Sequence, residues 1–444
     1  MKNNLSILFL GLLLFSSAVF ASENISELIL SNGLKIIVKP DHRTPVAAFQ
    51  IWYKVGSAYE YDGVTGISHM LEHLMYKGNN NPHLAENFHH LNDIGARGNA
   101  FTTRDHTYYY HILEKNHLAL AFKVEAARIQ YLSPSIEEFN IEKKVIREEM
   151  HVRINRDPYL PVYNALFQYA FPHNGYQFPI IGRSKDINSL SLAKTMSWYK
   201  NNYTPDNATI VVVGDVKAAE VFELAKKYFS GIKKMGPASK IQSFAEGTQT
   251  LSKKKENRYI MPDRTKVGMI LLAFKVPSIK TSMPEWEAYA LEVLAGWFES
   301  GTNSRLTKTL IRKQQLAHEI SISYSPMTRQ QSLFIIEALP AENASLTQLE
   351  QALDREIKLI KNEFISKKTL QKIKNQMIAA DIFDRDSIHT QAKIIGQAES
   401  VGIHWTEDAR YISRIKDVTA EQVKDVLHKY FIPANKIVIL QYAR

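Results

Sequence analysis

The sequence GISHMLEHLMYKG occupies residues 66–78 and holds two histidines and a glutamate at helical spacing. In a helix with 3.6 residues per turn, His69, Glu72 and His73 leave the same face. Two imidazoles one turn apart can hold a Zn²⁺ ion at roughly 2.0–2.1 Å per bond, and the neighbouring carboxylate can act as a general base toward a water that the metal activates. The pattern HxxEH therefore predicts a zinc peptidase site. The alternative is an amphipathic helix with two surface histidines.

The segments before this helix have the alternation and turn chemistry of β structure. LIL at 28–30 and LKIIV at 34–38 flank the sequence SNG, which predicts a hairpin. VAAFQIWY at 46–53 is a β-branched and aromatic run, which predicts another strand. Gly78 suits a left-handed cap, so we expect the metal-site helix to end there.

Three motifs of the first half recur in the second half in the same order. PDHRTPV at 40–46 is echoed by PDRTKV at 262–267, YKVGS at 53–57 by FKVPS at 274–278, and YTPDN at 203–207 by FIPAN at 431–435. A nearly constant shift aligns all three. We therefore expect an α+β fold with two similar domains, each a mostly antiparallel sheet packed with helices. The expected bounds are 22–232 for the N-terminal domain, 233–257 for a polar linker and 258–444 for the C-terminal domain.

The same alignment tests the metal site in the second half. It places Glu292, Ala295 and Gly296 opposite the three motif residues, so the second domain keeps the helix and lacks the metal ligands. One domain then carries the chemistry, and the other most economically forms the opposite wall of a substrate chamber.

The composition is that of a globular chain: 444 residues, 45% hydrophobic and 23% charged. The absence of cysteine excludes disulfides and thiolate ligands, which leaves His, Asp and Glu for metal binding. The formal charge of +10 comes from scattered Lys and Arg residues without a nucleic-acid-binding motif. We therefore expect a solvated basic surface and no nucleic acid partner.

Residues 1–21 have the features of a signal peptide. The start MKNN is cationic, residues 5–15 are apolar, and small residues precede a cleavage site after Ala21. An uncleaved anchor is the alternative, but the apolar run is shorter than the ~20 residues of a typical spanning helix. We expect export to the bacterial periplasm, with release from the cell left open, and no stable membrane span after signal removal.

A further helix is predicted to begin near Ser135 and to carry several carboxylates. Glu142 and Glu149 are seven residues apart and share a face. Val145 and Ile146 are among the residues that we expect on its buried side. A catalytic zinc usually has three protein ligands, so a carboxylate of this helix could complete the site.

Taken together, these motifs resemble the pitrilysin-type metallopeptidases, the inverzincins of peptidase family M16. The resemblance is to half-length bacterial members similar to the β subunit of mitochondrial processing peptidase. There the third zinc ligand is a glutamate in a Glu-Glu pair, and Glu149 lies 76 residues after His73. The resemblance implies that Glu149 is the third ligand of one Zn²⁺ per chain, with Glu148 as the alternative. It also implies that Glu142 orients a ligand; a solvated glutamate paired with a lysine is the alternative.

The sequence GARGNAFTTRDHTYYY at 95–110 also matches the family, in which this strand lies at a sheet edge beside the zinc and pairs with peptide substrate. An edge strand without a ligand is the alternative. Arg305 lies in an SRL stretch that matches the family as well, whereas Ile311 and His318 stand where the family has Arg and Tyr. The substrate-binding residues implied are Asn99, Ala100, Phe101, Thr102 and Arg305.

The resemblance implies a zinc-dependent endopeptidase that hydrolyses peptides or unfolded polypeptides, with Glu72 as the general base. Family members enclose their substrate chamber with four domains, so a two-domain chain implies a homodimer or a heterodimer with a related M16-like subunit. The alternative is a non-catalytic or partner-dependent subunit of the same fold with a structural zinc. Glu72 argues against it, because a structural site does not require a general base.

Overall fold

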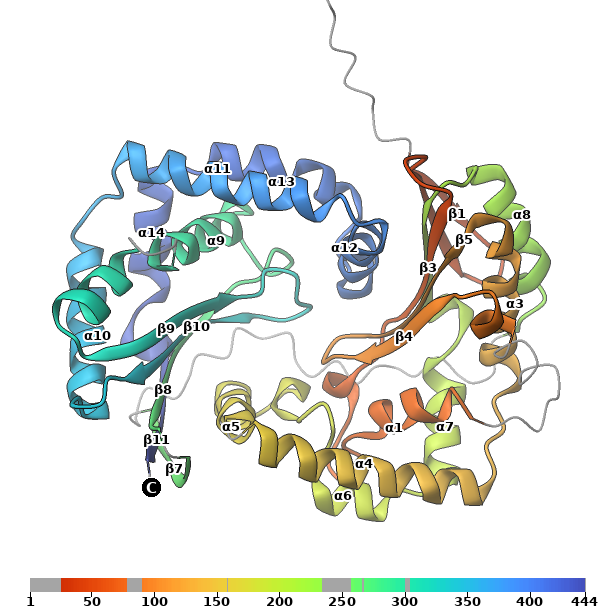
Figure 1. The fold of residues 1–444 in the computed structure, drawn as a ribbon, viewed down its shortest axis with the longest axis horizontal. Helices are drawn as coiled ribbons and strands as arrows, with labels where there is room; N and C mark the ends of the chain where they lie inside the picture. Colours follow the sequence, from red (N-terminus) through yellow and green to blue (C-terminus); the bar gives the residue numbers. More distant parts are fainter. Residues whose placement is uncertain are drawn as a thin grey trace, which may run out of the picture.

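The computed structural model describes residues 25–77, 90–157, 159–233, 257–265, 267–299 and 304–443. Within them the chain forms two halves that face each other, each built on a β-sheet packed with helices (Figure 1). The predicted α+β fold class is therefore confirmed. The predicted signal peptide lies outside the described residues, as does the predicted linker apart from its two end residues.

The first sheet has six strands in the order β1-β2-β6-β3-β5-β4. The strands are β1 (Ser26–Ile29), β2 (Lys35–Pro40), β3 (Val46–Tyr53), β4 (Arg97–Thr102), β5 (Thr107–Glu114) and β6 (Ala208–Gly214). β1 and β2 form the predicted hairpin. β2 runs parallel to β6, and the other neighbours are antiparallel. β4 lies at one edge, where it has no further strand partner within the described part of the chain.

The second sheet repeats this arrangement with five strands in the order β7-β11-β8-β10-β9. The strands are β7 (Arg258–Thr265), β8 (Met269–Val276), β9 (Ala317–Tyr324), β10 (Ser332–Pro340) and β11 (Lys436–Ala443). β7 and β11 are the parallel pair, as β2 and β6 are in the first sheet. A 3₁₀ turn precedes the closing strand in both halves, at Pro205–Asn207 and at Pro433–Asn435. The internal repeat predicted from the sequence is therefore confirmed.

Helices cover both sheets. Those of the first half are α1 (Ile67–Leu74), α3 (Leu118–Tyr131), α4 (Ile136–Arg156), α5 (Leu160–Ala170), α6 (Ser184–Ser189), α7 (Leu192–Asn202) and α8 (Ala218–Phe229). Those of the second half are α9 (Trp286–Glu299), a π-helical turn (Thr307–Lys313), α10 (Leu346–Lys361), α11 (Lys367–Asp384), α12 (Ile388–Val401), α13 (Thr406–Asp417) and α14 (Ala420–Tyr430). Among the helices described, none combines the length and the apolarity needed to cross a bilayer.

Each half lends one helix to the sheet of the other half. α12 buries Ala392 and Ile395 in a cluster with Trp52 of β3, on the face of the first sheet opposite α1. In the same way α5 buries Val162 and Leu166 against β8 and β11 of the second sheet (Figure 1). The domain bounds 22–232 and 258–444 stay a prediction. Because of this exchange, one face of each sheet is covered by a helix from the other half of the chain.

The exchange depends on a close approach between α12 and β3. A Cβ atom at Gly396 would lie 2.1 Å from Nε1 of Trp52, so a side chain cannot be placed there without moving the helix or the indole. The indole N–H donates to Oε1 of Gln50, and the amide of Gln50 donates to the carbonyl of His389 on α12. These contacts fix the position of α12 over the first sheet.

Candidate functional site

The helix that carries HxxEH is fixed at its start by a buried carboxylate. Gly66 precedes α1 with φ +85°, and a Cβ there would lie 2.5 Å from Cδ1 of Ile187. Glu60 accepts the N–H of Gly66 at 2.7 Å and the N–H of Ser68 at 2.9 Å, so it satisfies donors that a helix start leaves unpaired. No motif in the sequence pointed to Glu60, because it reaches the helix from a loop six residues upstream of Gly66.

The buried position of Glu60 predicts a pH-dependent stability. Burial raises its pKa to about 8, from an ordinary value of 4.5 that we assign to the unfolded chain. The folded state therefore retains a proton that the unfolded state loses, and this contribution to stability, complete below pH 4.5, disappears as the pH rises through 8. When the pH is raised from about 5 to about 8, the melting temperature of the wild type should fall by about 5 °C or more beyond any fall in the melting temperature of Glu60→Gln. Thermal unfolding of both proteins across this range checks it, and a constant difference would contradict it.

The end of α1 differs from the expectation. The helix ends at Leu74, with Met75 as its C-cap residue, and Gly78 lies outside the described residues. The N–H of Tyr76 donates to the carbonyl of His73 and the N–H of Lys77 to that of Leu74, and these i to i+3 bonds close the last turn tightly.

α4 runs beside α1 and supplies the carboxylates. It begins at the predicted place, with a capping box between Ser135 and Glu138. Glu142 is buried and Glu149 half-buried, whereas Glu148 is exposed. The side chain of Glu149 therefore lies near the motif histidines, whereas that of Glu148, the alternative ligand, is exposed to solvent.

The prediction that Val145 lies on the buried side of α4 was wrong. Its side chain is 44% exposed, while Ile146 is fully buried. The buried stripe runs through Phe139, Glu142 and Ile146, at i, i+3 and i+7, because the carboxylate of Glu142 takes a place that the apolar pattern alone assigns to a hydrophobic residue.

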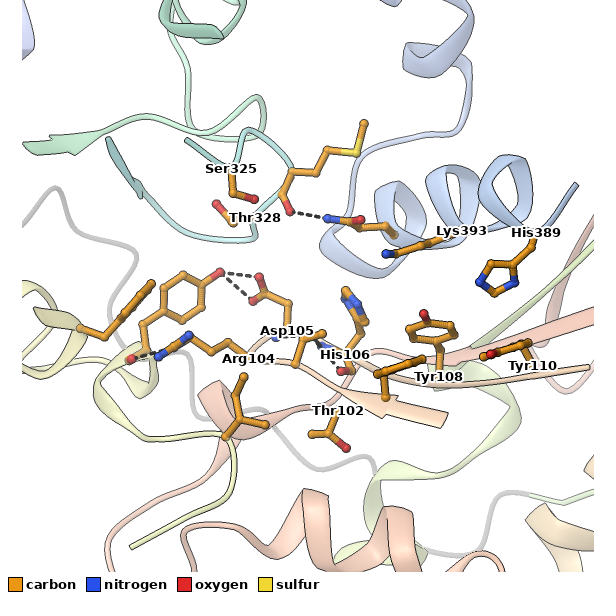
Figure 2. A pocket seen from close by; sticks show the side chains of 17 residues that line it. Thr102, Arg104, Asp105, His106, Tyr108, Tyr110, Ser325, Thr328, His389 and Lys393 are labelled. Atoms are coloured by element: carbon orange, nitrogen blue, oxygen red, sulfur yellow. Dashed lines mark hydrogen bonds between the residues drawn. The ribbon is translucent and has the colours of Figure 1, made fainter. Parts of the chain in front are cut away.

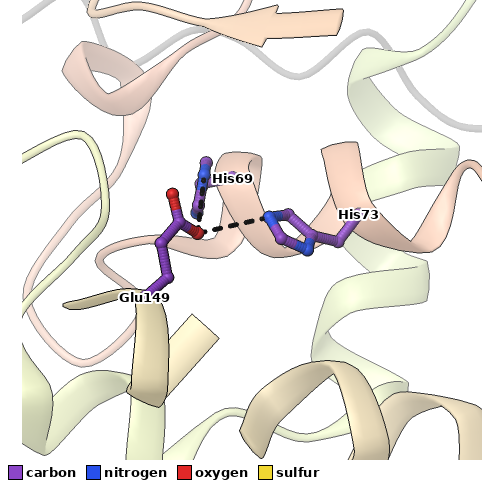
Figure 3. Close-up of side chains that lie close together, drawn as sticks. All are labelled: His69, His73 and Glu149. Carbon is purple, nitrogen blue, oxygen red and sulfur yellow. Dashed lines mark ion pairs between the residues drawn. The ribbon is translucent and has the colours of Figure 1, made fainter. Parts of the chain in front are cut away.

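His69, His73 and Glu149 meet at one point. Oε2 of Glu149 lies 3.7 Å from Nε2 of His69 and 3.5 Å from Nε2 of His73, and all three ligand atoms are within 4.8 Å of one another. Figure 3 shows the carboxylate facing both rings. Ligands bonded to a tetrahedral zinc at ~2.0–2.1 Å lie roughly 3.4 Å apart, so the spacing fits such an ion.

The chemistry of the three donors fits a metal as well. Oε2 of Glu149 is buried and makes no hydrogen bond with the described residues, which leaves its lone pairs directed at the imidazoles. Burial lowers the pKa of His69 to about 4, so this ring is neutral at pH 7, the form that binds metals. Burial raises the pKa of Glu149, but His73, His69 and Arg153 together bring it to about 2.

Two carboxylate contacts support the triad from outside. Nδ1 of His73 lies 3.1 Å from Oε2 of Glu142, whose Oε1 pairs with Lys77 at 3.2 Å. Arg153 forms an ion pair with Oε1 of Glu149, one helical turn away. Such contacts orient a metal ligand and tune its basicity. By contrast, Nδ1 of His69 is buried without a hydrogen-bond partner in the described residues.

Glu72 reaches the edge strand β4. The hydroxyl of Thr102 on β4 donates to Oε2 of Glu72. Burial raises the pKa of Glu72 above its ordinary value, which makes the carboxylate a stronger base. The residue predicted as the general base thus lies between the histidines and β4.

The predicted substrate strand lies where the sequence placed it, at the edge of a sheet. On β4, Asn99 is exposed, Ala100 is buried in the core and Phe101 is 46% exposed. Phe101 and Thr102 point to opposite faces, as successive residues of a strand do. Whether these residues bind peptide stays a prediction.

Arg305 occupies a different environment from the one expected of a substrate-binding residue. It pairs with Glu356 at 3.3 Å and with Glu363 at 3.0 Å, both within the second half. Ile311 is partly buried in the π-helical turn and His318 is exposed on β9. The substrate role of Arg305 stays a prediction.

Two family models match successive parts of the chain. Residues 35–182 match the model of Insulinase (Peptidase family M16), and residues 189–377 match the Peptidase M16 inactive domain. The second match covers α9, where Glu292, Ala295 and Gly296 replace the motif residues.

Several proteins are similar over most of the chain. The zinc protease PqqE of Helicobacter pylori is 28% identical over 84% of this chain and 79% of its own length. A probable mitochondrial-processing peptidase subunit beta of Arabidopsis thaliana is 24% identical over 90% of this chain and 75% of its own length. The crystal structure of a protease from Helicobacter pylori, 25% identical, superposes with a TM-score of 0.85 and covers 95% of this chain and 99% of that one. The chain therefore belongs to peptidase family M16, and it carries matches to both the Insulinase model and the inactive-domain model of that family.

Proposed function

We propose that the chain is a zinc-dependent endopeptidase that hydrolyses peptides or unfolded polypeptides. One observation carries the proposal: three ligand atoms spaced for zinc lie next to a half-buried carboxylate, Glu72, which contacts an edge strand able to pair with a peptide. Zinc is named for family relatives of this chain. One ion per chain, held by His69, His73 and Glu149, is our inference from the geometry.

The proposed chemistry assigns proton transfer to Glu72. A zinc ion bound by the triad would lower the pKa of a water and polarise a peptide carbonyl. The hydroxyl of Thr102 donates a hydrogen bond to Oε2 of Glu72, so we assign to Oε1 the proton that the attacking water gives up. The same carboxyl group then returns the proton to the amine nitrogen that departs.

The substrate would be held as an additional strand beside β4. The outer edge of β4 offers backbone N–H and C=O groups that pair with no strand in the described residues. An extended peptide can pair with such an edge through its main chain, and this selects unfolded segments over folded proteins.

Replacing Glu142 by glutamine should weaken zinc binding without removing it. The substitution keeps the shape of the side chain but exchanges the carboxylate near Nδ1 of His73 for a neutral amide. Loss of such a contact typically lowers metal affinity by about 10–100-fold. Competition with a chromophoric chelator measures it. An affinity equal to that of the wild type would mean that Glu142 does not support His73.

A pool of unstructured peptides tests the proposed function directly. The purified protein should cleave internal peptide bonds in the presence of zinc and should stop when a chelator removes the metal. Product masses identify the bonds. A zinc-loaded protein that leaves the whole pool intact would instead support the alternative, a subunit with a structural zinc or one that needs a partner.

We also infer that the active form is a dimer, with a second copy or with a related subunit, and that it works in the periplasm. The first inference is supported by relatives that are named as a subunit of a processing peptidase. The second rests on residues 1–21, whose composition is that of an export signal. Light scattering on the active fraction tests the first, and an active monomer would overturn it.

A further inference from the structure

A buried carboxylate in the turn between β4 and β5 contacts the second half of the chain. Asp105 lies in this turn and is 6% exposed. The hydroxyl of Tyr176 donates to its Oδ1 at 2.7 Å and to its Oδ2 at 2.6 Å. The backbone N–H of Arg329, in the loop between β9 and β10, donates to Oδ2 at 3.2 Å, and Nε of Arg329 lies 3.5 Å from Oδ1. Figure 2 shows the carboxylate of Asp105 turned toward the loop that carries Ser325 and Thr328.

The hydroxyl of Tyr176 contacts the same loop directly. Its oxygen accepts the backbone N–H of Arg329 at 3.1 Å and that of Gln330 at 3.2 Å. The guanidinium group of Arg329 also lies over the ring of Tyr59, 4.2 Å from its centroid. A buried carboxylate is costly unless donors satisfy its oxygens, and a buried N–H is costly without an acceptor. These bonds therefore hold the turn against the loop of the second half.

On its other side the turn contacts the segment that leads into α1. The N–H of Ser57 donates to the carbonyl of Thr103 at 3.0 Å, and the N–H of Ala58 donates to the carbonyl of Arg104 at 2.9 Å. Glu60 follows in this segment and accepts the first N–H groups at the start of α1. The position of the turn therefore affects the start of the helix that carries HxxEH.

The turn also continues directly from the residue that contacts the proposed base. β4 ends at Thr102, whose hydroxyl donates to Oε2 of Glu72. Oγ1 of Thr103 accepts the N–H of Asp105 at 3.2 Å and that of His106 at 3.1 Å, and these bonds brace the turn internally. Because the turn is short and braced, a shift of Asp105 would move Thr102 as well.

We propose that Asp105 is a positioning residue through which the second half of the chain holds Glu72 in place. The proposal rests on the proposed function, in which Glu72 is the general base. The loop between β9 and β10 fixes the turn, and the turn fixes both Thr102 and the start of α1; we call this series of contacts the Asp105 link. It gives the half without metal ligands a part in the reaction, since a displacement of about 1 Å at a reacting group can lower a rate by ~100-fold.

Asp105→Asn tests the link. The amide keeps the size of the side chain, but it is neutral beside Arg329 and replaces one of the two acceptor oxygens by an N–H₂ group. For a peptide that the wild type cleaves, kcat should fall by about 10-fold or more, whereas KM should stay within about 3-fold. Zinc affinity should stay unchanged, because no ligand is removed. Tyr176→Phe deletes the shared hydroxyl and should give the same result, and it provides the test if Asp105→Asn does not fold.

Glu337→Gln is the matched control. It makes the same change in a carboxylate that accepts the hydroxyl of Tyr163, and this pair joins β10 to α5 without involving β4 or α1. Its kcat should stay within about 3-fold of the wild-type value. If Asp105 served only to join the two halves, the two variants would cleave alike. A rise in KM with unchanged kcat in Asp105→Asn would also overturn the proposal, because Asp105 would then act on substrate binding.

Hydrogen exchange measures the link without turnover. Amide exchange of residues 102–106 and 66–70 should be about 10-fold faster or more in Asp105→Asn and should keep the wild-type rate in Glu337→Gln. Faster exchange in both segments of a protein that cleaves no peptide would support the link and refute the peptidase. Equal exchange and equal kcat in the two variants would overturn the link, and cleavage by the wild type would leave the peptidase intact.

Discussion

Replacing Glu72 by glutamine should lower peptide hydrolysis by about 10²–10⁴-fold while zinc binding stays close to that of the wild type. The amide keeps the size of the side chain and can still accept the hydroxyl of Thr102 through its oxygen, but it cannot take a proton from water. Glu72 lies outside the cluster formed by His69, His73 and Glu149, so its loss removes no ligand. Single-turnover cleavage of one peptide, with zinc content measured on the same sample, checks both halves of this result.

Asp62→Asn is a matched control for this variant. Asp62 carries the same kind of charge change, lies in the loop before α1 and is mostly exposed, with its carboxylate paired to Arg183. We expect cleavage within about 3-fold of the wild type, because a surface ion pair contributes little. A Glu72→Gln protein that cleaves at the rate of this control would remove Glu72 from the mechanism.

The sequence was sufficient for the parts of the site that depend on local geometry. The spacing of His69, Glu72 and His73 determines their common face once the segment is helical. The similar build of the two halves followed from motifs that recur in each half, and the edge position of β4 was implied by the family resemblance of residues 95–110. The first two of these predictions use information that lies within one helix or in a comparison of the two halves.

The features that the sequence did not predict depend on which surfaces meet. The apolar residues of α5 and α12 indicate that these helices are buried, but they do not indicate which sheet each helix packs against. The exchange of helices between the halves was therefore not predicted. Val145 was misplaced for a related reason, because a buried carboxylate took part of the inner face of α4. Glu60 was not predicted as a functional residue, because a carboxylate that caps a helix from a separate loop has no fixed sequence spacing from that helix.

Glu149→Gln should reduce zinc affinity by more than about 100-fold, because removal of a direct ligand costs at least as much as the upper range for an outer contact. Glu148→Gln is the matched control: it makes the same change in the neighbouring residue, which is exposed and was the alternative ligand on spacing alone. Zinc stabilises the folded state to the extent that it binds there and not to the unfolded chain. The wild type and Glu148→Gln should therefore melt at a higher temperature with zinc, and Glu149→Gln should not.

The geometry of α4 explains why the two substitutions should differ in their effect on zinc binding. Adjacent residues of a helix point about 100° apart, so only one of the two carboxylates can face the imidazoles. Oε2 of Glu149 is already 3.5 and 3.7 Å from them, and Arg153 holds its other oxygen. Chelator competition on the two variants separates the roles without requiring activity. Equal zinc affinity in both would show that the third ligand comes from elsewhere, and loss of zinc in Glu148→Gln alone would show that α4 binds in a rotated register.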